Sequence, residues 1–592
     1  MAINKLKVPE LYHSCDTEKF DFKTTAKLES LAEIIGQERA VGAVRFGVGI
    51  QRDGYNLFAL GPNGIGKNSL VRRYVEEKAE AKETPPDWCY VNNFEQPYKP
   101  HVLELPPGMG HELSTDMEQL IEDLHSAIPA VFESEEYRTR SQVIEEELSE
   151  RQERTIDEIR TAAREKGISL INTPTGITLA PTRNDEVMKI EDFKHLPKKE
   201  REQIEEDTEL LQQRLMKALH KAPQWQKEAR DKMAVLNREM AAYAAENLVD
   251  ALTEKYQELP AVVEHLNKVE ADVVEHFRNF LRPEGEKPSF IEAQLTGAEQ
   301  TSDTRYRVNT LVTHDTDGRA PVVYEDNPSY LNLIGRVEHR AYMGTLETDF
   351  TMIRAGALHL ANGGYLILDA LKVLMQPFAW EGLKRALQSQ EIRMESLGQM
   401  TSLVSTVSLE PQPIPLQIKL VLLGDRRIYY LLSYLDPEFS ELFKVAVDFD
   451  DRMDRNPDSQ QLYARLIATM IHNEKLLEFD GAAVARVIEH SARMVSDADK
   501  LSTHMGSLLD LLQESDHWAR ERKQEIVGRE DVQHAIDAAV HRADRVRDRV
   551  QEEIEHGTLL IDTRGKKVGQ INGLSVIQLG NFSFGQPSRI TA

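Results

Sequence analysis

Two patterns of apolar and polar residues divide the chain. Short apolar runs bounded by glycine or polar residues are typical of buried strands, and they lie at residues 56–61, 88–94, 363–370 and 418–425. Residues 31–50 and 69–82 instead have the apolar spacing of helices, with their charges on one side. Strands that alternate with helices predict a parallel sheet covered by helices on both faces. We therefore expect residues 56–61 and 88–94 to be strands of one such sheet.

The middle of the chain has a different pattern. Residues 134–167 and 198–256 are highly charged with spaced apolar positions, which predicts two long amphipathic helices in an antiparallel, coiled-coil-like arm. Residues 168–188 alternate apolar and polar side chains around a Thr-Gly turn, which predicts a small β element at the tip of the arm. Residues 457–551 are helical in pattern, and the last forty residues return to a strand pattern.

These changes of pattern predict five parts. Residues 1–114 form an N-terminal segment and the first half of an α/β core, and residues 301–456 form its second half. Residues 115–300 are an inserted helical arm. Residues 457–551 are a helical lid, and residues 552–592 are a β segment.

Composition and charge narrow the possible functions. The formal net charge of −26 argues against a general nucleic-acid-binding protein, because phosphate backbones are bound through surplus Lys and Arg. Cys15 and Cys89 are far apart and are expected to be free thiols of a reducing compartment. No apolar run approaches the ~18–20 residues that span a bilayer, and the first residues lack an apolar signal core. We expect a cytoplasmic protein.

A glycine-rich turn follows the first strand. It fits the pattern G-x-x-x-x-G-K and consists of Gly61, Pro62, Asn63, Gly64, Ile65, Gly66 and Lys67. Glycines let backbone N–H groups point at phosphate oxygens, the following helix presents its positive end, and the lysine reaches the outer phosphates. The turn therefore predicts a site for ATP or ADP. Asn68 stands where a Ser or Thr hydroxyl normally ligates Mg²⁺, and Ser69 follows one residue late, so Mg²⁺ binding is expected to be weak or rearranged.

Asp369 is the acidic partner that such a loop needs. It ends the apolar run at residues 363–370, and an acidic residue at the end of a neighbouring strand holds Mg²⁺ through water. The alternative is a buried strand that happens to end in Asp. Ala370 occupies the position where a Glu usually polarises the attacking water, and nothing in the sequence brings Glu381 close to the nucleotide.

Residues 34–69 and 324–370 together resemble the AAA+ ATPase part of Lon-type proteases, closest to the B-type branch and its bacterial Lon-like relatives. The resemblance implies an α/β AAA+ core with a long helical insertion, an all-α lid and a short C-terminal β segment. Archaeal B-type members carry membrane helices in the insertion, whereas the insertion here is charged. Residues 557–592 resemble the start of a Lon peptidase domain. The Ser–Lys dyad would lie further on, so we expect the AAA+ portion without the peptidase domain.

The resemblance also implies roles for several single residues. Asp425 occupies the sensor-1 position, where Asn is more usual, and His504 stands where a sensor-2 Arg would contact the γ-phosphate. Lys444 lies near the arginine-finger position, with Arg452 and Arg455 as alternatives, although each is also explained as a surface cation. Together with Asn68 and Ala370, these departures predict very slow hydrolysis or none.

Substrate handling is implied by the same resemblance. Tyr342 and Met343 precede a glycine and match a pore loop that grips polypeptides, although an ordinary hairpin explains them as well. The expected partners are polypeptide substrates and further copies of the chain in a ring, with a hexamer expected. His265, Glu275, His276, Glu489 and His490 lack metal-ligand spacing and are interpreted as surface residues.

Three functions remain open from the sequence. The first is the ATPase and unfoldase module of a Lon-like ATP-dependent protease. The second is a pseudo-ATPase scaffold that binds nucleotide weakly or not at all and does not hydrolyse it. The third, an AAA+ protein acting on nucleic acid or as a chaperone, is disfavoured by the acidic charge and the Lon-like tail.

Overall fold

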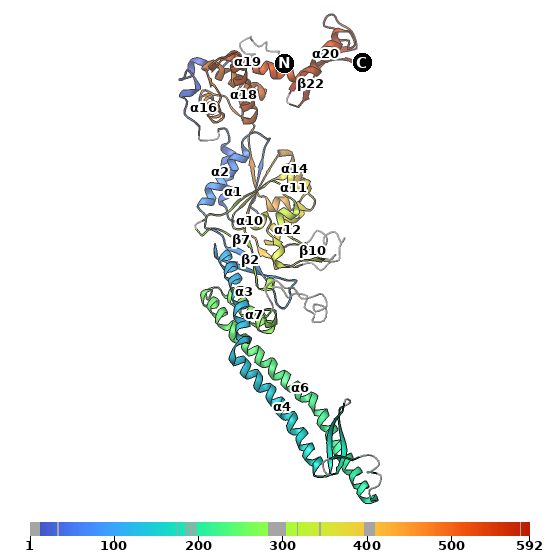
Figure 1. The fold of residues 1–592 in the computed structure, drawn as a ribbon. Helices are drawn as coiled ribbons and strands as arrows, with labels where there is room; N and C mark the ends of the chain where they lie inside the picture. Colours follow the sequence, from blue (N-terminus) through green and yellow to red (C-terminus); the bar gives the residue numbers. More distant parts are fainter. Residues whose placement is uncertain are drawn as a thin grey trace.

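A computed structural model describes residues 7, 12–31, 35–173, 176–183, 186–188, 193, 197–281, 303–316, 318–342, 345–395, 409–580 and 582–592. The molecule is elongated, with a helical lid at one end, an α/β core in the middle and a long arm at the other end (Figure 1). In this described part of the chain, no helix combines the length and apolar character needed to cross a membrane.

A parallel five-stranded sheet forms the centre of the core. Its strands lie in the order β17 (Val445–Asp448), β1 (Leu57–Leu60), β16 (Lys419–Gly424), β13 (Tyr365–Asp369) and β8 (Val322–Glu325). Every residue of β1 is buried, as is nearly every residue of β16 and β13. A parallel sheet with helices on both faces requires such continuous apolar runs. The predicted fold class is confirmed.

Alternate residues of β1 point into two separate cores. Leu57 and Ala59 pack with α1 (Glu38–Gly49) and α2 (Lys67–Glu80) on one face of the sheet. Phe58 and Leu60 face the second core, which is formed with α9 (Tyr330–Ile334), α10 (Ala357–Leu360), α11 (Ala370–Met375), α12 (Ala379–Ser389), α14 (Arg426–Leu435) and α15 (Phe439–Leu442). Three layers are visible in the middle of Figure 1.

The strand expected at residues 88–94 does not join the parallel sheet, so that prediction was wrong. β2 (Asp87–Val91) is the centre of a separate antiparallel sheet, between β3 (His101–Leu105) and β7 (Val308–Val312). The chain goes from β2 to β3 without a helix, and antiparallel neighbours need no crossover helix. A buried apolar run has the same appearance in either kind of sheet.

The antiparallel sheet forms the base of the arm with α3 (Met109–Glu133) and α7 (Pro260–Glu275). From this base, α4 (Glu135–Arg164) runs beside α6 (Lys198–Lys255). The two helices are antiparallel, because the pairs Arg140–Glu239 and Arg151–Glu228 run in opposite sequence order. Three short strands close the tip: β4 (Ile168–Thr173), β5 (Gly176–Arg183) and β6 (Glu186–Val187). The predicted long helical insertion is confirmed.

The lid is a helical layer that also binds the N-terminal segment. Its helices are α16 (Pro457–Glu474), α17 (Gly481–Met494), α18 (Met505–Glu521) and α19 (Arg529–Ala543). Residues 12–31 lie across these helices: the Tyr12 hydroxyl donates to Glu489 at 2.6 Å, and Cys15 N donates to the same carboxylate at 3.0 Å. Glu489 is 5% exposed, so its interpretation as a surface residue was wrong.

Short elements complete the described chain. α20 (Arg545–Glu555) leads to a hairpin of β22 (Gln570–Leu579) and β23 (Phe582–Thr591). The remaining two-stranded pairs are β9 (Arg336–Val337) with β12 (Ile353–Arg354), β10 (Arg340–Tyr342) with β11 (Thr345–Glu347), β14 (Glu391–Ile392) with β15 (Ile414–Pro415), β18 (Arg452–Asp454) with β20 (Lys500–Ser502), and β19 (Glu478–Phe479) with β21 (Ile526–Val527).

Candidate nucleotide site

The glycine-rich turn lies between β1 and α2, at the carboxyl end of the parallel strands. Gly61, Gly64 and Gly66 have φ angles of +157°, +84° and +80°, which favour glycine. Gly61 N donates to Gly424 O at 3.2 Å, so the turn starts in register with the end of β16. A Cβ on Gly61 would lie 2.5 Å from Ile65 Cδ1. The turn therefore closes tightly on itself and requires glycine at its first position.

Lys67 projects into the turn that precedes it. Its Nζ donates to Gly61 O at 2.7 Å, to Gly424 O at 3.1 Å and to Asn63 Oδ1 at 3.2 Å. The side chain is buried, and this burial lowers the pKa of the ammonium, while the charges of Asp369 and Asp425 act to raise that pKa. The ammonium of Lys67 thus lies between the glycine-rich turn and the strand ends that carry Asp369 and Asp425.

Asp369 ends β13 and Asp425 directly follows β16, at the same edge of the sheet. β16 separates β1 from β13, because Asp369 pairs with Leu423 and Leu423 pairs with Ala59. We expected the strand that carries Asp369 to lie directly beside β1. The structure corrects this expectation, because β16 lies between them. Both carboxylates also act as helix caps: Asp369 Oδ1 accepts from Lys372 N at 3.0 Å and starts α11, and Asp425 Oδ1 starts α14.

The atypical positions have clear structural surroundings. Ala370 is 1% exposed and packs in the core below the strand ends, so its side chain offers no polar group to a water molecule. Asn68 and Ser69 are exposed on the first turn of α2. Glu381 Oε1 lies 3.2 Å from Lys384 Nζ on α12, where it belongs to a separate ion-pair group.

The lid touches the phosphate loop at His504. His504 is the N-cap of α18, and its Nδ1 accepts from Ser507 N at 3.1 Å. A Cβ on Gly64 would lie 2.7 Å from His504 Cε1, and Gly506 N donates to Gly64 O at 3.0 Å. The structure thus brings together the loop and the lid residue that the sequence placed at the sensor-2 position.

Lys444 lies at the other end of the sheet. It precedes β17, and its backbone N donates to Gly54 O at 3.0 Å before the start of β1. Its Nζ lies 5.1 Å from the centre of the Tyr55 ring. Because β1 and β17 are parallel, Lys444 is separated from the phosphate loop by the length of the strand. A role for this side chain at a nucleotide therefore requires a second subunit.

Arg455 and Arg452, the two alternatives to Lys444, differ in how far their side chains are exposed. Arg455 is 9% exposed, and its guanidinium donates to Ala498 O and His13 O. This side chain is thus held within the lid. Arg452 is exposed on β18.

A cation that the sequence interpretation missed is Arg426. It follows Asp425 directly, and its Nε donates to Asp448 Oδ1 at 3.0 Å across the end of β1. Its guanidinium also donates to Phe449 O. The available signal was a basic residue immediately after an acidic strand end, but only the register of β17 shows what it contacts.

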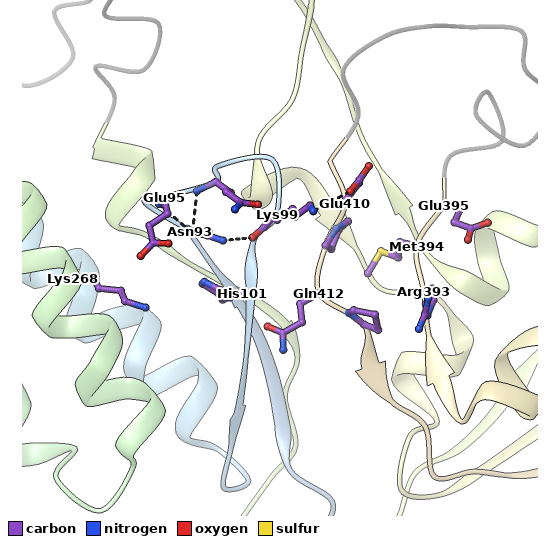
Figure 2. A pocket seen from close by; sticks show the side chains of 13 residues that line it. Asn93, Glu95, Lys99, His101, Lys268, Arg393, Met394, Glu395, Glu410 and Gln412 are labelled. Atoms are coloured by element: carbon purple, nitrogen blue, oxygen red, sulfur yellow. Dashed lines mark hydrogen bonds and ion pairs between the residues drawn. The ribbon is translucent and has the colours of Figure 1, made fainter.

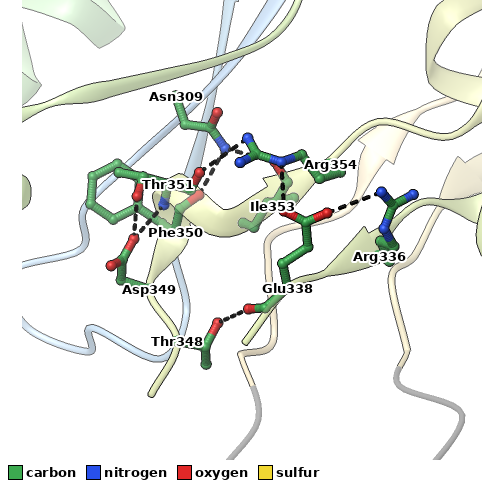
Figure 3. A network of polar contacts seen from close by, with 9 residues as sticks. All are labelled: Asn309, Arg336, Glu338, Thr348, Asp349, Phe350, Thr351, Ile353 and Arg354. Carbon is green, nitrogen blue, oxygen red and sulfur yellow. Dashed lines mark hydrogen bonds and ion pairs between the residues drawn. The ribbon is translucent and has the colours of Figure 1, made fainter. Parts of the chain in front are cut away.

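The hairpin of β10 and β11 carries the expected pore-loop residues. Tyr342 ends β10 and pairs with Thr345, and Met343 lies outside the described residues. The base of the hairpin is fixed by Glu338, whose carboxylate accepts from Arg336 and Arg354 at 3.0 Å each (Figure 3). Glu338, which lies just before β10, is thus held by two cations.

The same polar network ties the segment that carries the hairpin to the antiparallel sheet at the base of the arm. The Thr348 hydroxyl donates to Glu338 O at 2.8 Å, and Asn309 Nδ2 on β7 donates to Phe350 O at 2.8 Å and Ile353 O at 3.1 Å (Figure 3). The sheet at the base of the arm therefore contacts the segment that carries the hairpin.

A cleft of about 1010 Å³ lies between the arm base and the core. Its lining contains cationic and acidic side chains, with Lys99 Nζ 3.8 Å from Glu410 Oε2 (Figure 2). It includes none of the nucleotide-site residues, since it is bordered by the segment that precedes β16 rather than by the segment that follows it. In the described part of the chain, no group of three or more His, Cys, Asp or Glu side chains is arranged to hold a metal ion.

The sheet order, the phosphate loop after β1, the acidic strand ends and the lid contact define the class of this protein as an AAA+ module. Three family models match the chain: "LonB-like, AAA domain" at residues 318–450, "Archaeal LonB, AAA+ ATPase LID domain" at residues 478–542, and "Lon-like LonC helical domain" at residues 87–120. The AAA+ portion of the chain is thus similar to that of Lon-type proteins. The phosphate loop itself lies outside the three matched ranges.

Curated relatives show the same similarity. A Lon protease homolog of Escherichia coli K12 is 26% identical over 250 residues, which are 40% of this chain and 40% of the relative. The corresponding homolog of Haemophilus influenzae is 26% identical over 241 residues, covering 40% of this chain and 38% of the relative. An archaeal Lon protease of Methanothermobacter thermautotrophicus is 24% identical over 273 residues, covering 45% and 41%. The match thus spans about two fifths of each relative.

Among solved structures, NtrX of Brucella abortus aligns with 48% of this chain and 64% of its own chain, at 13% identity and a TM-score of 0.23. A likeness at this level carries no argument about fold or function.

Proposed function

We propose that this chain is the ATP-binding AAA+ module of a Lon-like ATP-dependent protease, and that it passes polypeptides to a peptidase domain. The observation that carries the proposal is the position of the Lys67 ammonium. It lies within the phosphate loop, beside the strand ends that carry Asp369 and Asp425, and the lid closes on the same loop through Gly506.

The residues of the site suit a nucleotide polyphosphate. Loop amides and the N-terminus of α2 provide donors, and Lys67 provides a charge for the outer phosphates. One oxygen of Asp369 caps α11, and the other is available to hold Mg²⁺ through water. Bound Mg²⁺ would neutralise phosphate charge. Asn68 offers an amide oxygen in place of a hydroxyl, so we propose that Mg²⁺ is held weakly.

Hydrolysis is proposed to be slow. A buried methyl group at Ala370 stands where a carboxylate would orient water, and His504 offers an imidazole at the lid instead of a guanidinium. Losing one group that stabilises charge at the reacting phosphate costs on the order of a hundredfold in rate. The module would then act mainly by binding nucleotide, with slow hydrolysis.

Assembly with further copies of the chain, as a ring, is part of the proposal. α11 and α14 have Asp369 and Asp425 as their N-caps and lie on the same side of the core (Figure 1). Their outward positions expose large apolar side chains: Leu371, Leu374, Met375, Tyr430, Leu431, Tyr434 and Leu435. Tyr434 alone is 86% exposed. Exposed apolar side chains gathered on one side of a protein often mark an interface, and we propose that a neighbouring copy binds here.

Binding and turnover of ATP by wild type and Lys67→Ala test the nucleotide assignment. We expect wild type to bind ATP and Lys67→Ala to lose binding, with little or slow hydrolysis in wild type. Lys78→Ala is the matched control, because Lys78 is exposed on the same helix. Binding by Lys67→Ala equal to wild type would contradict the proposed site.

Assembly is tested by the molar mass in solution, measured by light scattering with and without ATP. Tyr434→Glu is expected to reduce a wild-type oligomer to smaller species. Tyr243→Glu is the control, because Tyr243 is equally aromatic and 62% exposed on α6 of the arm. A wild-type monomer at all concentrations, or equal masses for all three proteins, would contradict the proposed interface.

A further inference from the structure

Arg426 crosses the end of the strand from which the phosphate loop departs. Gly424 of β16 pairs with Leu60 of β1, and Leu60 pairs with Asp448 of β17 on the other side. Arg426 lies two residues after Gly424, yet its Nε donates to Asp448 Oδ1 at 3.0 Å. The side chain therefore spans the end of β1, where Gly61 begins the loop.

The guanidinium is anchored to a backbone that touches the loop. It donates to Phe449 O, and that oxygen lies 3.5 Å from the position that a Cβ on Gly61 would occupy. Phe449 N in turn donates to Leu60 O at 2.9 Å. The charged end of Arg426 is thus held next to the first residue of the phosphate loop.

Arg426 also starts within reach of Lys67. Lys67 Nζ donates to Gly424 O at 3.1 Å, and the Cα of Arg426 is at most about 7.6 Å from that of Gly424, because consecutive Cα atoms are about 3.8 Å apart. An extended arginine side chain covers a similar distance. The Arg426 side chain is 30% exposed, so part of it faces solvent.

The present partners of Arg426 belong to the segment that connects core and lid. Asp448 and Phe449 begin this connector, and Asp451 Oδ2 lies 3.7 Å from Arg426 Nη1. Thr503, next to His504 in the lid, donates its N to Asp451 O at 3.1 Å. Gln37 holds the connector from the N-terminal side through both backbone groups of Asp450. Arg426 is therefore linked to the lid through two short contacts.

The charge of Arg426 suits a phosphate as well as it suits the carboxylate of Asp448. Burial acts to lower the pKa of Arg426, but the hydrogen bond and charge of Asp448 outweigh it and raise the pKa, so the group is a permanent cation. A guanidinium binds phosphate oxygens through two parallel donors, and such contacts are stronger than neutral hydrogen bonds. A polyphosphate on the loop therefore competes with Asp448 for the same donors.

We propose that Arg426 is a phosphate-binding residue of this site, which exchanges Asp448 for the outer phosphate of ATP and so couples the nucleotide to the core–lid connector. This inference rests on the proposed nucleotide site. It supplies from within the same chain a cation that the atypical residues at the other positions do not provide.

Two substitutions with opposite expected signs test the exchange in the full chain. Arg426→Ala should weaken ATP binding by about tenfold or more, with a smaller loss for ADP, because a charge-assisted hydrogen bond is lost mainly at the outer phosphate. Asp448→Asn should tighten ATP binding, because it frees the guanidinium and removes one negative charge. Arg427→Ala is the control: its side chain is exposed and makes no hydrogen bond or ion pair among the described residues.

Dissociation constants for ATP and ADP, with thermal denaturation of each variant, separate the outcomes. A purely structural Arg426–Asp448 pair would make both variants less stable and would weaken binding in both. That result, or equal ATP binding by Arg426→Ala and Arg427→Ala, would overturn this inference while the nucleotide site stands. If wild type binds neither nucleotide, the proposed function fails, and this inference fails with it.

Discussion

The core with its lid and the long arm are stabilised in different ways. In the core and lid, residues far apart in sequence meet through backbone groups at close range, as Gly64 meets Gly506 and Gln37 meets Asp450. Along the arm, α4 buries only Ile159 and Ala163 and contacts α6 through exposed ion pairs. The core and lid depend on a few tightly packed contacts, where an added atom would clash. The arm depends on many weak contacts. Single substitutions should therefore have very different effects in the two regions.

The largest effect is expected at Gly364, which directly precedes β13. A Cβ there would lie 2.1 Å from Pro321 O and 2.8 Å from Pro321 Cδ. Gly364→Ala should lower the free energy of unfolding by about 3 kcal/mol, because backbone rather than a flexible side chain must move. Gly42→Ala is the control: nothing lies within 4 Å of its Cβ position in α1, and alanine should stabilise the helix by up to about 1 kcal/mol. Equal melting temperatures for the two variants would contradict the comparison.

At the base of the arm, unlike along α4 and α6, we expect a single buried residue, His265 on α7, to have a large effect on stability. His265 is 5% exposed, and burial, then the nearby His101 and Lys268 charges, lower its pKa to about 4. In the unfolded chain its pKa is near 6.5. Stability from the neutral ring is thus complete above about pH 6.5 and is lost as the pH falls to about 4, by about 3 kcal/mol.

His265→Leu should therefore flatten the decrease in stability between pH 6.5 and 4, measured by urea denaturation across this range. An unchanged pH slope would show that His265 is accessible to protons in the folded protein. The earlier interpretation of His265 as a surface residue was wrong, because an isolated histidine in a helical pattern gives no indication of burial.

The lid offers an intermediate case at Glu489. Burial acts to raise its pKa, but Tyr12, the Cys15 N–H and Arg529 outweigh it and lower the pKa. Its stabilising effect should be present above about pH 4.5, the ordinary glutamate value, and should be lost at lower pH. Glu489→Gln should cost about 2 kcal/mol near neutral pH and remove this acid dependence.

Thermal denaturation at pH 7 and pH 4, with exposed Glu474→Gln on α16 as the control, measures this effect. If the two glutamine variants behave alike, the N-terminal segment does not depend on Glu489.

The smallest effect is expected on the arm. Lys232 on α6 pairs with Glu147 on α4, and the two side chains are 58% and 57% exposed. Lys232→Ala should change stability by less than about 0.5 kcal/mol, since exposed pairs are screened and conformationally costly. A melting temperature that drops as far as that of Gly364→Ala would show that the arm is not held by distributed contacts.

Much of the fold followed from local patterns. The apolar runs at β1, β13 and β16 and the long charged helices of the arm are elements whose periodicity is strong and whose burial is uniform. β2 was assigned to the wrong sheet, because its apolar run is compatible with parallel and antiparallel pairing alike. Tyr342 stays a prediction as a pore-loop residue, since its place on β10 fits a pore loop and an ordinary hairpin equally well.

The site was predictable from the sequence only where its residues are close together in the chain. The glycines and Lys67 lie within seven consecutive residues, so sequence spacing alone fixes their proximity. Asp369 was expected at the same edge, but the intervening β16 was not. Arg426 was missed, since its partner Asp448 ends a different strand and is reached only across the end of β1.

The sequence by itself determined which segments become strands and helices and where the glycine-rich turn forms, because these depend on side-chain period and on backbone freedom within a few residues. Only the tertiary structure decided which strands are neighbours, which polar groups are buried, and which charges meet at the loop. Those outcomes depend on the packing of segments hundreds of residues apart, and no local pattern in the chain encodes the register at which such segments meet.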